Sequence, residues 1–223
     1  MAGVTDRLDG FTDAAFAFAL TLLVIGRGGV PENLDGLAAA MAELPAFAIG
    51  FAIIGMFWFT HVRWRRYRGE GDWVSVLLTF ILIFLVLVYV RPLQAMALSL
   101  SAVLGAPGLR FHGDVGSLFT IYGAGFAAMA AVVTGLFAEA RRNPALGPDG
   151  RRQLRGEIVI WSILTATGLL SMLLSLFDAT ERAAPWPYAT LPITIGLFAA
   201  LYDWDGKKTR AADPAPELAG AAE

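Results

Sequence analysis

The sequence predicts an all-α integral membrane protein with six transmembrane helices and both termini in the cytoplasm. The apolar composition, the length of the apolar runs and the distribution of Lys and Arg predict it. Hydrophobic residues make up 57% of the 223 residues, and the mean hydropathy is +0.60; a soluble domain is roughly 45–50% apolar. Residues 73–90 read WVSVLLTFILIFLVLVYV, with no polar face. A run of this length crosses a hydrocarbon core of about 30 Å.

Breaks rich in Gly, Pro and Arg divide the chain into its expected segments. We expect six spanning segments, at about 8–26, 37–61, 73–91, 115–138, 156–177 and 186–204. Proline disfavours an unbroken helix, so the apolar stretch 93–104 after Pro92 is predicted to be a kinked extension or an interfacial helix. Residues 1–205 are expected to form the membrane unit. Residues 206–223, rich in Ala, Pro and charge, are expected to be a disordered cytoplasmic tail.

Positive charge sets the predicted orientation. Six segments place both termini on one side together with loops two–three and four–five. That side holds thirteen of the 17 Lys and Arg residues, namely Arg7, the clusters 63–68 and 141–155, and those in 207–210. The other side holds Arg27, Arg91, Arg110 and Arg182. Because Lys and Arg concentrate in cytoplasmic loops, we expect a multi-pass protein of the cell membrane, with the basic loops attracting anionic lipid.

Composition also argues against several other classes of protein. With no cysteine the sequence offers no disulfide framework or thiolate metal site, and the net charge of −2 gives no reason to expect a nucleic-acid partner. Without a paired His metal site or a Gly-x-Ser-x-Gly motif, we expect neither an enzyme, nor a cofactor, nor a permanently bound metal. Most acidic residues near the segments lie at predicted helix ends, where solvated or capping roles are expected: Glu43, Asp72, Glu139, Glu157 and Asp178.

The first segment carries a carboxylate inside the membrane. Asp13 lies about 9 Å past the start of the segment at 1.5 Å per residue. An ionised Asp costs roughly 2.5–3.5 kcal/mol at the bilayer centre, so it needs a protein partner and is a candidate functional residue. Phe11, Ala15, Phe18, Leu22 and Ile25 share one helix face. Their spacing alone favours a packing stripe, and Asp13 points away from that stripe.

Two short motifs resemble those of a known family. Arg7-x-x-x-Phe11-Thr12-Asp13 opens the first segment, and Trp58-x-x-His61 ends the second. Taken singly, Trp58 is typical of an interfacial anchor and His61 of a structural hydrogen-bond partner. Together the motifs resemble the Arg-x-x-x-Phe-Ser-Asp and Trp-x-x-His signature of the bacterial and endolysosomal potassium channels of the transmembrane protein 175 family.

This resemblance implies a bacterial inner-membrane homotetramer whose first helices line a central pore. The tightest hydrophobic ring of the family falls on Phe18, where members usually carry Ile or Leu. Further rings fall on Leu22 and Ile25, and the selectivity-associated Thr falls on Thr21, so permeant K⁺ is expected near Phe18 and Thr21. The structural polar network falls on Arg7, Thr12, Asp13, Trp58 and His61. Thr12 replaces the usual Ser and keeps the hydroxyl.

The expected activity is therefore a potassium-permeable cation channel whose selectivity arises at a hydrophobic constriction. The sequence has no Thr-Val-Gly-Tyr-Gly motif, which supplies the carbonyl filter of other potassium channels. A secondary, ion- or proton-coupled transporter is the alternative. Such folds often contain internal repeats, but the second half of the chain holds no second copy of the first-segment motif.

Overall fold

The computed structural model describes residues 2–25, 32–42, 44–69, 72–103 and 114–204. The regular elements of these residues are all helical. They are α1 (Ala2–Ile25), α2 (Leu34–Ala42), α3 (Leu44–Arg68), α4 (Trp73–Val103), α5 (Val115–Ala140), α6 (Pro148–Ser175), the short 3₁₀ helix η1 (Glu181–Ala183) and α7 (Trp186–Leu201). The expected tail at 206–223, and with it the boundary between the two expected units, lies outside the described residues.

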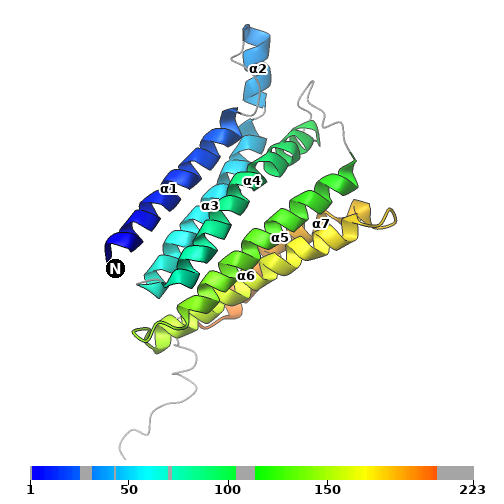
Figure 1. Ribbon diagram of the computed structural model, residues 1–223. Helices are drawn as coiled ribbons and strands as arrows, with labels where there is room; N and C mark the ends of the chain where they lie inside the picture. The colour runs from blue at the N-terminus through cyan, green and yellow to red at the C-terminus, as the bar shows by residue number, and fades with distance from the viewer. Residues whose placement is uncertain (1, 26–31, 43, 70–71, 104–113, 205–223) are drawn as a thin grey trace, which may run out of the picture.

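The long helices lie side by side in one slanted bundle (Figure 1). α1 packs on α3 and α4, α5 packs on α6, and α4 joins the two groups by packing on α5. α7 packs on α6, and the short α2 extends beyond the bundle from the end where α1 finishes and α3 begins (Figure 1). α1 therefore occupies one margin of the bundle, and α6 and α7 lie at the other.

Five helices are long and apolar enough to cross a membrane within the described ranges. They cover Phe47–Arg68, Trp73–Ser99, Gly116–Ala140, Pro148–Ser175 and Glu181–Leu201. Much of their surface is left uncovered by the rest of the chain, because 11% to 50% of the residues in each apolar window are buried. An apolar surface of this extent suits hydrocarbon as the solvent. The protein is thus an all-helical, multi-pass membrane protein.

The expected segment 37–61 is wrong at both ends. Its first part belongs to the separate helix α2, whereas α3 begins at Leu44 and continues to Arg68. The cluster 63–68 therefore lies on the last two turns of α3 and not in a loop. In the same way α6 begins at Pro148, so Arg151, Arg152 and Arg155 are helical. Both helices continue past their apolar runs, and arginines in their basic ends form ion pairs with other parts of the chain.

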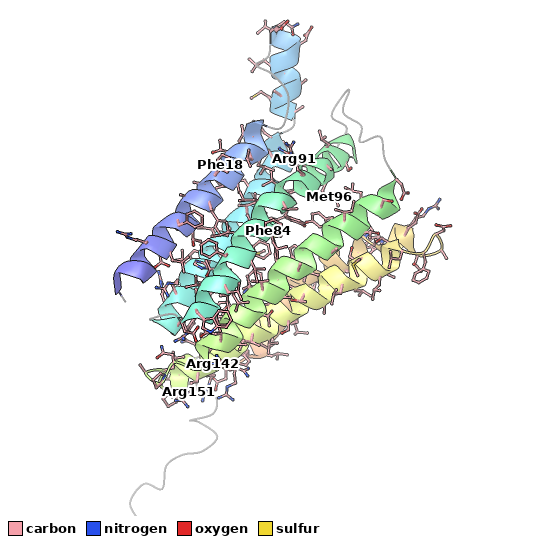
Figure 2. All side chains as sticks on the ribbon, viewed as in Figure 1. Phe18, Phe84, Arg91, Met96, Arg142 and Arg151 are labelled. Atoms are coloured by element: carbon pink, nitrogen blue, oxygen red, sulfur yellow. The ribbon has the colours of Figure 1, made fainter. Side chains whose placement is uncertain are left out.

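Pro92 does not interrupt its helix. α4 runs without a break from Trp73 to Val103, with Pro92 inside it. Residues 93–103 therefore extend this helix and do not form a separate interfacial helix, and residue 104 lies outside the described residues. Arg91 and Met96 lie on this last part of α4, toward the end of the bundle away from Arg142 and Arg151 (Figure 2).

Small residues bring α5 and α6 into close contact. A Cβ atom added at Gly168 would lie 2.8 Å from the backbone nitrogen of Ala127, and one added at Gly123 would lie 2.8 Å from the carbonyl oxygen of Gly168. Neither distance leaves room for a side chain. Glycines of this kind let membrane helices approach by their backbones and gain packing contacts that lipid cannot replace. Of this pair, α5 is the helix against which α3 and α4 pack.

Candidate functional site

One face of α1 is packed into the rest of the chain. Phe16 is 2% exposed, and Ala19 and Leu23 are fully buried. Their spacing of three and four residues places them on one side of the helix, and this side faces α3 and α4. Gln94 of α4 reinforces the contact, because its side-chain amide donates a hydrogen bond of 2.9 Å to the carbonyl of Leu22.

The opposite face of α1 is uncovered. Phe18 is 56% exposed, and Phe11, Thr21 and Val24 on the same side are exposed as well. Leu22 lies at the border and is half-buried against the core. The side chain of Ile25 lies outside the described residues. α1 forms one margin of the bundle, and Phe18 lies on it about two-thirds of the way along (Figure 2).

Two hydroxyl groups of α1 bond to their own helix. Thr21 Oγ1 donates to the carbonyl of Ala17 at 2.9 Å, and Thr12 Oγ1 donates to the carbonyl of Leu8 at 2.7 Å. A hydroxyl oxygen that donates its proton keeps its lone pairs as acceptors. Thr12 is buried, whereas Thr21 is exposed beside Phe18. Thr21 therefore presents an oxygen acceptor on the uncovered face, next to an apolar ring.

Asp13 finds its partner on α3. Trp58 Nε1 donates a hydrogen bond of 2.8 Å to Asp13 Oδ1. One turn earlier, Asp9 Oδ1 forms an ion pair with Arg65 Nε, also at 2.8 Å. These two contacts fix the N-terminal half of α1 against the C-terminal half of α3. Together they hold α1 at a defined height and rotation relative to α3.

The other three residues of the expected polar network lie apart from this pair. His61 is buried, and its Nε2 lies 3.1 Å from Thr79 Oγ1 of α4, with its ring 5.1 Å from that of Trp64. Thr12 bonds within α1, and Arg7 is exposed. The structure thus joins Asp13 with Trp58, and His61 instead links α3 to α4. Arg65, Asp9 and Thr79 were not singled out from the sequence, because their pairing joins residues far apart along the chain.

Two buried carboxylates were also misinterpreted from the sequence. Glu139 and Glu157 are 6% and 2% exposed, so the expected solvated or capping role is wrong for both. Glu157 of α6 pairs with Arg63. Glu139 of α5 accepts from Arg68 Nε at 2.6 and 2.7 Å and from Ser75 Oγ at 3.1 Å.

Asp72 does cap a helix, as expected from its position at a predicted end. Its Oδ1 accepts from the backbone nitrogens of Val74 and Ser75 at 3.0 and 3.1 Å at the start of α4. The Ser75 N–H and the nearby Arg68 guanidinium lower the pKa of Asp72 from 3.8.

No group of three or more His, Asp or Glu side chains could hold a metal ion among the residues that the structure describes. The polar groups that do meet are engaged in pairs between helices. The uncovered face of α1 differs, because an aromatic ring and a hydroxyl oxygen lie there side by side.

A family match, a related protein and a solved structure all point to the same class of protein. The family described as endosomal/lysosomal potassium channel TMEM175 matches residues 7–89, which contain both sequence motifs. A potassium channel of Marivirga tractuosa is 30% identical over 210 residues, covering 88% of this chain and 82% of that protein. The crystal structure of a variant of the potassium channel MtTMEM175, in complex with a nanobody–MBP fusion protein, matches with a TM-score of 0.75 at 28% identity. That match covers 87% of this chain and 92% of the other.

Proposed function

Because the chain belongs to the TMEM175 family of potassium channels, we propose that it forms a homotetrameric, potassium-permeable cation channel with α1 of each copy lining the pore. The observation that carries this proposal is the division of α1 into two faces. Phe16, Ala19 and Leu23 attach the helix to its own subunit, and Phe18 and Thr21 are left uncovered. Four such faces around an axis enclose a conduit that one subunit cannot form.

The proposed conduit works without a carbonyl filter. The ring of four Phe18 side chains is apolar, and apolar constrictions gate by dewetting. Potassium sheds water more readily than the smaller sodium ion, so potassium crosses such a ring at lower cost. The Thr21 oxygen, one turn further along, replaces part of the lost hydration, and Leu22 and Ile25 continue the wall. The phenyl rings add cation–π attraction at the narrowest level.

The polar pairs between α1 and α3 support this arrangement. A shift of one residue along a helix rotates its face by about 100°, which would replace Phe18 in the pore by a neighbour. The Asp13–Trp58 hydrogen bond and the Asp9–Arg65 ion pair oppose such a shift. We assign these contacts the role of keeping the pore face of α1 directed at the axis.

The proposed topology has six crossings and cytoplasmic termini in the bacterial inner membrane. α1 has 24 residues, or about 36 Å at 1.5 Å per residue, which is sufficient for a sixth crossing. The N-terminal end of α1 lies at the same end of the bundle as Arg142 and Arg151 (Figure 2). This placement supports a cytoplasmic N-terminus by the positive-inside rule. The relatives, named as channels, favour this function over a secondary transporter.

Ion flux through liposomes containing the purified protein tests the proposal. Wild-type protein is expected to pass potassium passively and faster than sodium. Phe18→Ala is expected to widen the constriction, raise sodium flux and bring the two rates together. Phe84→Ala, an exposed phenylalanine on α4 (Figure 2), serves as the matched control. Unchanged potassium and sodium flux in Phe18→Ala would remove Phe18 from the constriction, and saturating, proton-coupled flux would favour a transporter.

A further inference from the structure

The end of α1 away from Arg142 and Arg151, which we call its outer end, has its own contacts with α3 and α4 (Figure 2). Leu23 is fully buried there, and it packs between Gly50 of α3 and Leu93 of α4. A Cβ atom added at Gly50 would lie 3.2 Å from Leu23 Cδ2 and 3.5 Å from Leu93 Cγ. The missing side chain of Gly50 therefore makes the room that Leu23 occupies.

Gln94 adds a directional contact to this packing. Its side-chain Nε2 donates to the carbonyl oxygen of Leu22 at 2.9 Å and lies 3.5 Å from that of Leu23. Both carbonyls belong to the last turn of α1, where the helix itself supplies no N–H partner. An unpaired carbonyl is costly inside a membrane, because no water is present to bond it. The Gln94 amide thus caps the outer end of α1 from a neighbouring helix.

The type of side chain at Gln94 fits this role. The residue is 8% exposed and follows the buried Leu93 on α4. Burying an amide is unfavourable unless it is hydrogen-bonded, whereas an apolar side chain of similar length would carry no such requirement. A carbonyl oxygen only accepts, so α1 requires the donor of the amide here. The amide contributes a direction, which apolar packing alone does not supply.

The proposed pore face of α1 lies between two anchors. The inner anchor includes the hydrogen bond to Asp13, and the outer anchor holds the carbonyl of Leu22. Nine residues separate them, which is about 14 Å at 1.5 Å per residue. Phe18 and Thr21 lie between the two. A helix fixed at one end only can still turn or slide at the other, so both anchors are needed to set the rotation of these side chains.

We infer that Gln94 is a positioning residue for ion discrimination, because its hydrogen bond to Leu22 holds the outer half of α1 with Phe18 and Thr21 facing the axis together. The inference rests on the proposed pore role of α1. Without the donor, the last turn of α1 rotates and withdraws the Thr21 oxygen from the level at which an ion sheds its water. Potassium and sodium then differ less in the cost of passage. Gln94 touches no ion and acts through α1.

The flux ratio of potassium to sodium in liposomes tests the inference. Gln94→Met removes the donor and keeps a side chain of similar length. Ser171→Ala is the matched control, because it removes another buried hydrogen bond to a carbonyl, from Ser171 Oγ to Ala184 at 2.7 Å, on the side of the bundle away from α1. Both variants are expected to lose some thermal stability. Only Gln94→Met is expected to lower the flux ratio, at least twofold.

Gln94→Glu supplies a readout that lost stability does not mimic. A carboxyl group of this length donates a hydrogen bond only while it is protonated. The flux ratio of Gln94→Glu, compared with wild type at the same pH, is therefore expected to be near the wild-type value at acidic pH. At alkaline pH it is expected to approach that of Gln94→Met. A ratio equal to that of Gln94→Met under both conditions would contradict the donor role.

Gly50→Ala perturbs the same anchor without changing Gln94. Its Cβ atom presses on Leu23 at 3.2 Å, so it is expected to lower the flux ratio in the same direction as Gln94→Met. Gly55→Ala on the same helix, where nothing lies within 4 Å of the added atom, is expected to leave the ratio unchanged. This pair of variants decides the matter if Gln94→Met does not assemble.

Hydrogen–deuterium exchange tests the anchor without ion conduction. The amides of residues 22–25 are expected to exchange several-fold faster in Gln94→Met than in wild type, and at the wild-type rate in Ser171→Ala, since loss of an anchor favours local opening. Unchanged exchange in Gln94→Met would overturn the inference, as would faster exchange with an unchanged flux ratio. A wild-type protein that passes no potassium would refute the channel proposal, and exchange alone would then decide whether Gln94 holds α1.

Discussion

Neutralising Glu139 is expected to destabilise the bundle strongly. This carboxylate accepts from Arg68 Nε through both oxygens, at 2.6 and 2.7 Å, and from Ser75 Oγ at 3.1 Å. The side chains of Glu139 and Arg68 are only 4% and 11% exposed. Glu139→Gln preserves the shape of the side chain and removes its charge. It leaves the Arg68 guanidinium partly buried, with the more exposed Asp72, at 3.6 Å, as its remaining anionic partner.

The expected loss follows from the burial of the pair. Removing one member of a buried ion pair costs about 3–5 kcal/mol. The remaining contact with Asp72 resembles an exposed pair, which contributes about 0–1 kcal/mol. We therefore expect Glu139→Gln to lower the free energy of unfolding by about 2–4 kcal/mol.

Unfolding by added SDS in mixed detergent micelles measures this quantity, with helix content followed by circular dichroism. Arg68→Gln is expected to show a loss of similar size. Arg66→Gln, an exposed arginine on the same helix, is the matched control and is expected to change the free energy by less than about 0.5 kcal/mol. The double variant of Arg68 and Glu139 should lose much less than the two single variants together. A Glu139→Gln protein as stable as the wild type would refute the reasoning.

Three further outcomes follow from named contacts. Trp58→Phe removes the donor to Asp13 and is expected to cost about 1–2 kcal/mol of unfolding free energy; equal stability would show that this bond does not fix α1. Gly168→Ala places a Cβ atom 2.8 Å from the backbone of α5 and is expected to lower the melting temperature in detergent. In the control Gly55→Ala, nothing lies within 4 Å of the added Cβ atom, so the melting temperature is expected to stay unchanged or rise. Equal melting temperatures of the two variants would contradict the close packing. Asp114 caps α5. Its carboxylate accepts hydrogen bonds from backbone N–H groups, that of Ser117 first, and these bonds lower its pKa from 3.8. The contribution of this cap to the free energy of unfolding is therefore present above pH 3.8 and is lost as the pH falls through the folded-state pKa. The difference in melting temperature between wild type and Asp114→Ala should shrink on acidification. A constant difference would argue against the cap.

The sequence was sufficient for the features that depend on local pattern. The run 73–90 is apolar on all sides, and it lies in one uninterrupted helix. The spacing of Phe11, Phe18 and Leu22 identified a shared face of the first helix, and the structure leaves Phe11 and Phe18 exposed, with Leu22 half-buried. Periodicity established that these residues share a face, but not what that face contacts.

Features that depend on partners distant in sequence were not predictable. Arg68 and Glu139 are separated by 71 positions, and hydropathy assigned one to a loop and the other to a solvated helix end. Once paired, each can remain helical in a buried position, which is why α3 and α5 extend beyond their apolar runs. His61 illustrates the same limit, because its partner Thr79 is an unremarkable hydroxyl within an apolar segment. Charges beyond an apolar run indicate the end of a helix only if they lack partners.

The central claim, that the uncovered face of α1 lines the ion path, is tested most directly by chemical block. The chain has no cysteine, so Phe18→Cys introduces its only thiol, and Phe84→Cys does the same on an exposed part of α4. Potassium flux through each variant in liposomes is measured before and after a positively charged methanethiosulfonate reagent. The account predicts that the reagent stops flux through Phe18→Cys and leaves flux through Phe84→Cys intact. Unaltered flux through a fully modified Phe18→Cys protein would contradict it.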